Sequence, residues 1–324
     1  MILPTGGTIA GQADARAANA YNAAALGPQQ LIAAVPGITK LADLSAEQIA
    51  AVASQDMNDA IWFKLAKRIQ EAVDKNEADG FVITHGTDTM EETAFFLDLI
   101  LNTDKPVVLV GSMRPSTAMS ADGPGNLYEA VKVAADPQSR SRGVMVVMNE
   151  KIDSARGVTK TQTTAVETMQ SPNLGAMGYV DPASVRFLQP AHTRAKSPLK
   201  LPNTPELPRV EIIYSHSNMD GQQIEHAIAD NAKGIVLASK GDGNTSKQAL
   251  EALQKAVAKG IVVVRSTRVT YGYVNRNVEV NDDESGFVTS LDLNPQKSRV
   301  LTQLLIANSI TSAAEVQKAF AEHR

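Results

Sequence analysis

The 324-residue chain contains no cysteine. This absence excludes disulfide bonds, thiolate catalysis and cysteine-ligated metal sites. The five histidines are scattered, and none belongs to an HExxH or H-x₃-H pattern; they are His85, His192, His216, His226 and His323. We therefore expect neither a metal site nor a cofactor, and hydroxyl groups are the nucleophiles that remain for catalysis.

An excess of charge of one sign is also missing, because 31 lysines and arginines face 35 acidic residues. Nucleic acid is therefore not an expected partner. No apolar run approaches the roughly 20 residues of a membrane span, so a membrane is not expected as a partner either. Residues 1–7 are too short for a secretory signal. We expect a periplasmic location if a signal segment has been removed, and a cytoplasmic one otherwise.

The stretch that is richest in structural signals is residues 81–101. Phe81 to Ile83 form a short apolar run typical of a buried parallel strand, and apolar residues at helical spacing begin at Met90. Thr89 and Glu92 have the spacing of a capping box, which predicts that Thr89 is the N-cap of this helix. The turn from Thr84 to Asp88 then lies where open α/β sheets bind ligands.

Similar alternation along the chain predicts an α/β fold with a doubly wound, mostly parallel sheet. In an N-terminal domain, residues 1–188, we expect further strands at 1–4, 48–53, 106–110 and 144–148 and helices near 62–73 and 127–134. Residues 12–27, rich in alanine and asparagine, are expected to form a mobile flap.

The second half of the chain begins with a proline-rich stretch. Residues 189–208 contain Pro190, Pro198, Pro202, Pro205 and Pro208. This composition predicts a linker, followed by a smaller α/β domain over residues 209–324. In that domain we expect strands at 210–214, 235–238 and 261–265 and helices at 222–230, 247–259 and 313–321.

Four polar loops follow predicted strands of the N-terminal domain. They are residues 5–11, 54–58, 84–89 and 149–164. Loops that follow parallel strands share one edge of the sheet, so residues distant in sequence can converge there. Thr8 and Thr87 stand beside glycine in such loops, Lys160 can relay a proton if its surroundings lower its pKa, and Asp88 can orient it. A hydroxyl, an amine and a carboxylate in this combination suit acyl transfer.

Several polar or aromatic residues of these loops and of the predicted flap have a purely structural interpretation. Thr87 and Asp88 can be ordinary helix caps, Lys160 can be a solvated side chain, and Tyr21 can be a hydrophobic anchor. His85 is expected to satisfy a backbone group rather than to act as a base. The Gly6-Gly7 pair can cradle a phosphate, but no complete nucleotide-binding motif accompanies it.

Several motifs, in order along nearly the whole chain, closely resemble the bacterial type II L-asparaginases. They are TGGTIAG at 5–11, SQDMND at 54–59, THGTDTMEET at 84–93, GSMRPSTAMSADGPGNLY at 111–128, TKTQTT at 159–164 and LNPQKSRVL at 293–301. The resemblance implies an amidohydrolase that acts on L-asparagine, with secondary activity on L-glutamine, through a threonine acyl-enzyme. It also implies a homotetramer whose sites lie at the interface of close dimers.

The resemblance implies roles for individual residues. The implied catalytic residues are Thr8 as nucleophile, Tyr21 of the flap, Thr87, Asp88 and Lys160. The implied substrate-binding residues are Ser54, Gln55 and Asp88, together with Asn244 and Glu279, which reach into the site of the neighbouring subunit.

Three residues depart from the pattern of that family. Pro4 precedes TGGT and removes a backbone donor, while Lys240 and Asp242 place charges in the turn that carries Asn244. Two other functions remain open at this point: an amino-acid-binding module that uses the same cleft without turnover, and a glutaminase-type amidotransferase subunit. A lysine beside two threonines argues against the first. The absence of an appended partner-docking domain argues against the second.

Overall fold

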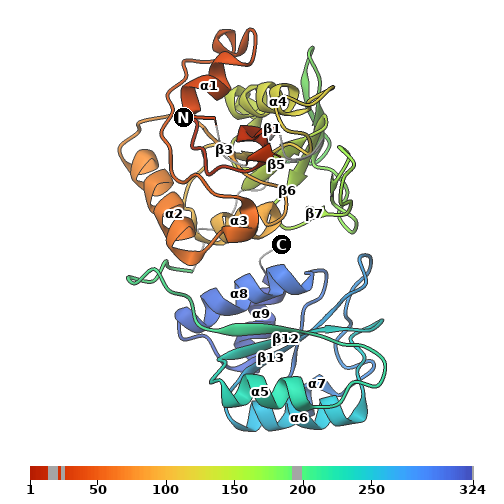
Figure 1. Ribbon diagram of the computed structural model, residues 1–324. Helices are drawn as coiled ribbons and strands as arrows, with labels where there is room; N and C mark the ends of the chain where they lie inside the picture. Colours follow the sequence, from red (N-terminus) through yellow and green to blue (C-terminus); the bar gives the residue numbers. More distant parts are fainter. Residues whose placement is uncertain (14–20, 23–25, 192–198, 323–324) are drawn as a thin grey trace. The chain divides into compact units, whose positions relative to one another are not determined.

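The computed structural model describes residues 1–13, 21–22, 26–191 and 199–322, and the side chains of residues 12–25 lie outside the described part. The chain divides into two compact units, residues 1–197 (unit 1) and 198–324 (unit 2). Both units have helices packed on a sheet (Figure 1), which confirms the predicted α/β class. Most of the predicted flap, residues 14–20 and 23–25, lies outside the described residues.

Unit 1 is built on a six-stranded sheet with the strand order β10-β9-β6-β5-β4-β3. The strands are β3 (Phe81–Thr84), β4 (Val107–Val110), β5 (Val144–Met148), β6 (Lys151–Ser154), β9 (Gly178–Val180) and β10 (Val185–Phe187). β3, β4 and β5 pair in parallel. The pairings of β5 with β6, β6 with β9 and β9 with β10 are antiparallel, so the sheet is mixed.

Helices cover both faces of this sheet. They are α1 (Pro28–Ala33), α2 (Asp59–Asp74), α3 (Met90–Ile100) and α4 (Gly123–Ala135). Four short 3-10 helices also occur: η1 (Thr8–Ala10), η2 (Ile38–Lys40), η3 (Ser54–Asp56) and η4 (Pro137–Ser139). Two small antiparallel sheets have two strands each. One pairs β1 (Gln12–Ala13) with β2 (Tyr21–Asn22), and the other pairs β7 (Thr159–Lys160) with β8 (Met169–Gln170). α4 begins earlier than predicted because Pro124 fits its first turn.

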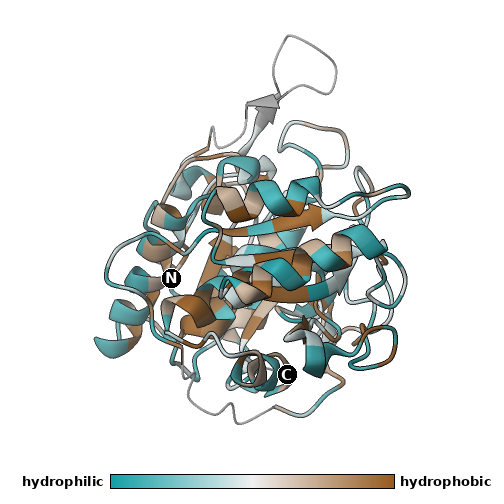
Figure 2. Ribbon diagram, turned by 90° about the horizontal axis from the view of Figure 1, so that it is seen from below, coloured by the Kyte–Doolittle hydropathy of each residue, from teal (hydrophilic) through white to brown (hydrophobic). Residues whose placement is uncertain are grey.

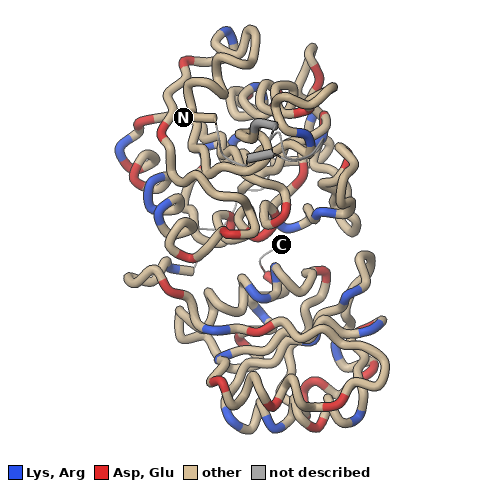
Figure 3. The backbone as a smooth tube through the Cα atoms, viewed as in Figure 1, with Lys and Arg blue, Asp and Glu red and all other residues tan. Residues whose placement is uncertain are grey.

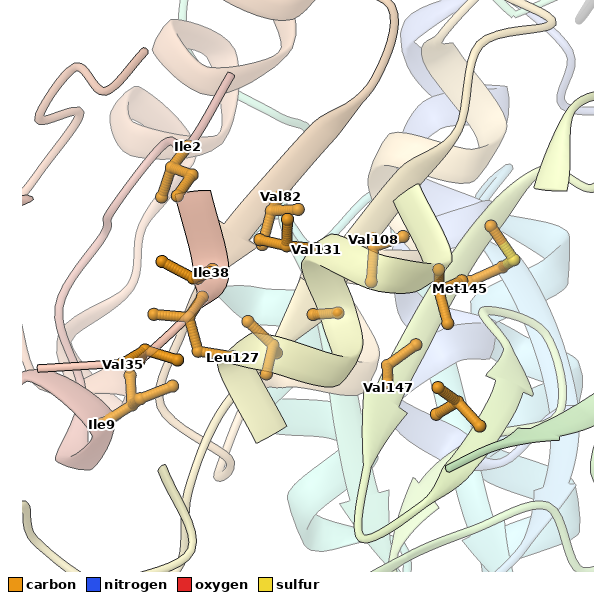
Figure 4. Close-up of a cluster of buried hydrophobic side chains, with 14 of the residues drawn as sticks. Ile2, Ile9, Val35, Ile38, Val82, Val108, Leu127, Val131, Met145 and Val147 are labelled. Carbon is orange, nitrogen blue, oxygen red and sulfur yellow. The ribbon is translucent and has the colours of Figure 1, made fainter. Parts of the chain in front are cut away.

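The core of unit 1 lies between the sheet and α4 (Figure 4). Val82, Val108 and Val147 point from the sheet toward Leu127 and Val131 of α4. Each such side chain, when fully buried, contributes about 1.5–3 kcal/mol to stability. Alternate strand residues face the other side of the sheet. In the chain as a whole, Figure 2 shows apolar strands in the interior and polar outer sides on the helices.

The predicted strands at 1–4 and 48–53 are wrong in this form, because both segments make only isolated bridges. Ile2 bridges to Val82 of β3, and the N–H of Leu3 donates to Val82 O at 2.8 Å. On the other side, the first segment faces residues 46–52. Pro4 has no N–H to donate to them, so no regular ladder forms there. Its carbonyl still accepts from the N–H of Ile49 at 2.9 Å, which holds the two segments together.

The predicted loop at 149–164 contains strands that the sequence did not reveal. Asn149 and Glu150 both have positive φ, 53° and 64°. This is the backbone of a tight hairpin turn, which returns the chain antiparallel to β5 as β6. The turn lacks the glycine that usually marks it, so the reversal was not visible as a pattern. β7 then places Lys160 opposite Met169 of β8.

Unit 2 contains a four-stranded parallel sheet in the order β11-β12-β13-β14. Its strands are β11 (Val210–Tyr214), β12 (Gly234–Ser239), β13 (Val262–Thr267) and β14 (Val288–Thr289). Its helices are α5 (Gln222–Ala229), α6 (Lys247–Ala258), α7 (Asp282–Ser285), α8 (Pro295–Ala307) and α9 (Ala313–Glu322). α5 and α6 pack on one face of this sheet and α8 on the other (Figure 1).

Charged residues of both signs are interspersed over both units in the view of Figure 3. No helix among the described residues is both long and apolar enough to cross a membrane.

One buried ion pair lies at the centre of the loops in unit 2. Arg265 of β13 and Asp282 of α7 are both fully buried, and their side chains meet at 2.6 Å (Nε to Oδ1) and 2.7 Å (Nη2 to Oδ2). Arg265 Nη1 also donates to Gly243 O at 2.9 Å. A side chain at Gly243 would clash, because its Cβ would lie 2.2 Å from Arg265 Nη1. The planar guanidinium therefore fixes the shape of this turn.

We expect Arg265→Leu to destabilise unit 2 by about 3–5 kcal/mol, because it leaves the Asp282 carboxylate buried and unpaired. Urea unfolding at fixed protein concentration measures this effect. Arg209→Leu is the matched control, since Arg209 pairs with Glu211 at an exposed position. Its unfolding midpoint should equal that of the wild type, and a similar loss in both variants would contradict a special role of the buried pair.

Candidate active site

The candidate site of unit 1 begins at the carboxyl end of β3. The turn from Thr84 to Asp88 follows this strand, and His85 continues the ladder by donating its N–H to Val110 O at 2.9 Å. Gly111, which follows β4, packs directly against this turn. A Cβ on Gly111 would lie 2.7 Å from His85 O and 3.2 Å from Thr87 Cγ2. Only glycine therefore fits between the two strand ends.

A second glycine contact brings the TGGT loop to the same place. Gly7 has φ 81°, and a Cβ there would lie 2.3 Å from the backbone nitrogen of Gly86. The two loops thus touch backbone to backbone, which only glycines permit. Thr8 follows Gly7 as the first residue of η1 and is 9% exposed. This contact delivers Thr8 to the vicinity of Thr87, as the shared sheet edge predicted.

The buried histidine of the turn has a structural role. Trp62 Nε1 can only donate, and it donates to Thr93 Oγ1 at 2.8 Å. Gly86 O can only accept and lies 2.7 Å from His85 Nδ1, so the proton of the neutral ring is on Nδ1, and the Thr93 hydroxyl donates to His85 Nε2 at 2.8 Å. Burial lowers the pKa of His85 to about 4, which keeps the ring uncharged at neutral pH. The expected backbone contact of His85 is confirmed.

Lys160 joins two residues of the turn. Its Nζ lies 2.9 Å from Thr87 Oγ1 and 2.6 Å from Asp88 Oδ1. Only 19% of the Lys160 side chain is exposed, so the alternative of a solvated lysine is wrong. Thr87 and Asp88 are not helix caps either, because the N-cap of α3 is Thr89. Spatial proximity of a hydroxyl, an amine and a carboxylate is what proton transfer requires.

The backbone of Lys160 is held by a residue that the sequence did not single out. Glu91 of α3 is buried, and its Oε2 accepts from the N–H of Lys160 at 2.9 Å. Pairing of β7 with β8 fixes the same segment from the other side. Met113 was also missed: the Thr87 hydroxyl donates to its Sδ at 3.4 Å. Both residues lie in quoted motifs, but their contacts depend on chain folding rather than on spacing.

Ser54 is tied to the same turn by two hydrogen bonds. The N–H of Asp88 donates to Ser54 Oγ at 3.2 Å, and Thr89 Oγ1 donates to Ser54 O at 2.8 Å. The predicted capping box at Thr89 is therefore wrong: Thr89 is the N-cap residue, but its side chain makes no capping bond. Its hydroxyl instead fixes η3. Ser54 is buried, whereas the neighbouring Gln55 is exposed.

The remaining predicted residues lie elsewhere. Tyr21 lies on β2 with its backbone opposite Ala13, and its side chain lies outside the described part. Asn244 and Glu279 belong to unit 2. The backbone of Asn244 pairs with Lys240, and the side chain of Lys240 donates to His216 O at 3.3 Å. Glu279 is exposed in the segment before α7.

The site offers hydroxyl, amine and carboxylate groups rather than a cluster of metal ligands. Among the residues that the structure describes, no three histidine, aspartate or glutamate side chains are arranged to hold a metal ion. The arrangement is suited to attack of a hydroxyl on a carbonyl carbon, with proton transfer through Lys160.

Comparison with known proteins agrees with this chemistry. The family model described as "Asparaginase, N-terminal" matches residues 1–193, and the model described as "Glutaminase/Asparaginase C-terminal domain" matches residues 209–320. A protein of Haemophilus influenzae described as "Probable L-asparaginase periplasmic" is 50% identical over 95% of this chain and 88% of its own length. A "Glutaminase-asparaginase" of Pseudomonas fluorescens is 43% identical over 100% of this chain and 90% of its own.

A solved structure gives the same result. The crystal structure of a probable cytoplasmic L-asparaginase from Campylobacter jejuni superposes with a TM-score of 0.93, at 45% identity, over 99% of this chain and 98% of that chain. The relatives support neither of the two alternative functions. Since both family models and these relatives span almost the whole sequence, the chain belongs to the asparaginase family of hydrolases.

Proposed function

We propose that this enzyme hydrolyses the side-chain amide of L-asparagine to L-aspartate and ammonia, and that L-glutamine is a secondary substrate. The observation that carries the proposal is the contact of Lys160 Nζ with both Thr87 Oγ1 and Asp88 Oδ1 beside the TGGT loop. The printed names of the relatives, L-asparaginase and glutaminase-asparaginase, support the two substrates.

The proposed reaction proceeds through an acyl-enzyme. Thr8 Oγ attacks the carboxamide carbon, the bond from carbon to nitrogen breaks, and ammonia leaves with the proton that Thr8 loses. Water then attacks the resulting ester, and Thr8 recovers its proton while aspartate is released. Thr87, Lys160 and Asp88 form the second catalytic set, through which a proton moves in the cycle.

Negative charge develops on the amide oxygen in both steps and requires hydrogen-bond donors. The N–H of Gly7 is already engaged, since it donates to Val52 O at 3.0 Å. The donors that we propose for this role are the backbone N–H of Thr87 and those of the Gly6 to Thr8 turn other than Gly7.

The proposed substrate site recognises a zwitterion. Ser54 and Gln55 bind the α-carboxylate and α-amino groups, and Asp88 faces the ammonium. Ser54 Oγ accepts from the backbone N–H of Asp88 at 3.2 Å, so Ser54 is attached to the turn that carries Asp88. Glu279 and Asn244 complete the site from the neighbouring subunit of a homotetramer. Unit 1 would therefore carry the chemistry, and unit 2 would supply binding groups to a neighbour.

Discrimination between the two amides rests on one methylene group. Such a difference is worth only about 1–3 kcal/mol in a pocket, so activity on L-glutamine is expected at a lower rate. We expect the enzyme in the periplasm if a signal segment has been removed, and in the cytoplasm otherwise. The Haemophilus influenzae relative is described as periplasmic and the Campylobacter jejuni structure as cytoplasmic.

We expect Thr8→Ala to lower kcat for L-asparagine by about a thousandfold or more, because no acyl-enzyme can form. Ammonia release from L-asparagine and from L-glutamine, measured for both proteins, tests the reaction and its nucleophile together. Turnover of Thr8→Ala close to that of the wild type would exclude Thr8 as nucleophile. Failure of the folded wild type to hydrolyse either amide would contradict the proposed function.

We expect Lys160→Met to keep the fold and to lower kcat by about 10²–10⁴-fold, since proton transfer is lost. Lys151→Met is a matched control. The side chains of both lysines are 19% exposed, but Lys151 contacts Glu167 and Gln170 instead of the site. The control should retain wild-type kcat. Equal losses in the two variants would remove Lys160 from the mechanism.

Subunit mixing tests the shared site. Glu279→Ala subunits keep Thr8, and Thr8→Ala subunits keep Glu279, so their hybrids contain some sites of wild-type composition. We expect mixing under conditions of subunit exchange to restore low-KM activity that neither variant has alone. If exchange is demonstrated by mass spectrometry and no activity returns, Glu279 does not act across the subunit boundary.

A further inference from the structure

Two separate segments of unit 2 carry the residues that we propose to reach a neighbouring site. Asn244 lies in the turn after β12, and Glu279 lies in the segment between β13 and α7. The turn is tight, because Gly241 and Gly243 have φ values of 52° and 80° and Lys240 pairs with Asn244 across it. Both residues can serve one substrate only if the distance between the two segments is fixed.

Buried contacts in the interior of unit 2 join the two segments. Arg265 donates to Gly243 O of the turn at 2.9 Å and to Asn275 O of the second segment at 3.4 Å. Asp282, which pairs with Arg265, accepts from the N–H of Asn277 at 2.8 Å. One buried guanidinium with its carboxylate thus contacts the backbone on both sides.

A second link lies nearer the surface. Asp242 Oδ1 accepts from the backbone N–H of Asn275 at 2.6 Å, and Asp242 Oδ2 accepts from Asn275 Nδ2 at 2.9 Å. Both oxygens of this carboxylate therefore bind one residue of the opposite segment. Hydrogen bonds to a charged acceptor are about twice as strong as neutral ones and are directional. Asp242 is one of the residues that depart from the family pattern, and its charge is engaged in this contact.

We infer that Asp242 is a positioning residue, which holds the segment of Glu279 at a fixed distance from Asn244 and thereby sets the affinity for the substrate. The inference rests on the proposed roles of these two residues. Asp242 acts through its bonds to Asn275 and not by contact with substrate. Its loss should therefore raise KM and leave kcat almost unchanged, because the nucleophile and Lys160 lie in unit 1.

The substitution for the test is Asp242→Ala, which removes both bonds at a position where folding does not depend on a buried charge. Asp242→Asn is the conservative variant. It loses the charge but keeps an oxygen that can accept from the N–H of Asn275. Glu251→Ala is the matched control, since Glu251 is an exposed acid on α6 and its removal changes the net charge equally.

Steady-state kinetics with L-asparagine should give the following result. Asp242→Ala raises KM about tenfold with kcat within about twofold of wild type, as expected for loss of charge-assisted hydrogen bonds. Asp242→Asn recovers most of the wild-type KM, and Glu251→Ala equals wild type. In a double-mutant cycle, Asp242→Ala adds little to Glu279→Ala, because the first substitution acts through the second residue. Melting temperatures of Asp242→Ala and Glu251→Ala should agree.

Several results would overturn the inference. The first is an unchanged KM in Asp242→Ala while Glu279→Ala raises KM. The second is an Asp242→Asn variant whose KM is raised as much as that of Asp242→Ala. The third is a double variant in which the two increases in KM multiply. The second result would indicate that the negative charge acts by itself rather than through the bond to the N–H of Asn275, and the third that the residues act independently. Failure of the proposed function is distinguishable from these, because the wild type would then release no ammonia. An unchanged KM in Glu279→Ala would instead remove both the role of Glu279 and the inference that depends on it.

Discussion

The backbone contact between Gly7 and Gly86 is the constraint on which the candidate site depends. A Cβ at Gly7 would lie 2.3 Å from the nitrogen of Gly86, and one at Gly86 would lie 2.6 Å from Ser54 Oγ. Three loops that are distant in sequence are thereby packed at one edge of the sheet. The proximity of the TGGT loop to the turn that carries Thr87 follows from this packing.

Groups around this contact are held in one protonation state or one position. His85 is neutral because it is buried, and its single proton is on Nδ1, which donates to Gly86 O. Glu91 holds the backbone of Lys160, whose side chain then reaches Asp88. Rigid support of this kind lets a polar site act without rearranging when charge develops.

Unit 2 uses the same device with different residues. A glycine with positive φ, Gly243, makes room for the guanidinium of Arg265, and Asp282 neutralises it. The charged turn residues are engaged as well, since Asp242 binds Asn275 and Lys240 binds His216 O. Charges that look anomalous in the sequence are therefore parts of the loop architecture. In both units, close backbone packing at glycine determines where the polar groups lie.

The sequence by itself determined the α/β class, the strand and helix from Phe81 to Ile100, and the convergence of loops at one sheet edge, because hydrophobic periodicity and turn residues are local signals. It also indicated the family, through motifs that were in place along the chain. Only the tertiary structure decided the rest. The hairpin at Asn149 has no glycine signal, Pro4 interrupts a predicted strand, and the hydroxyl of Thr89 binds Ser54 instead of capping its helix. Lys160 meets Thr87 across 73 residues of sequence, and no local pattern encodes such a contact.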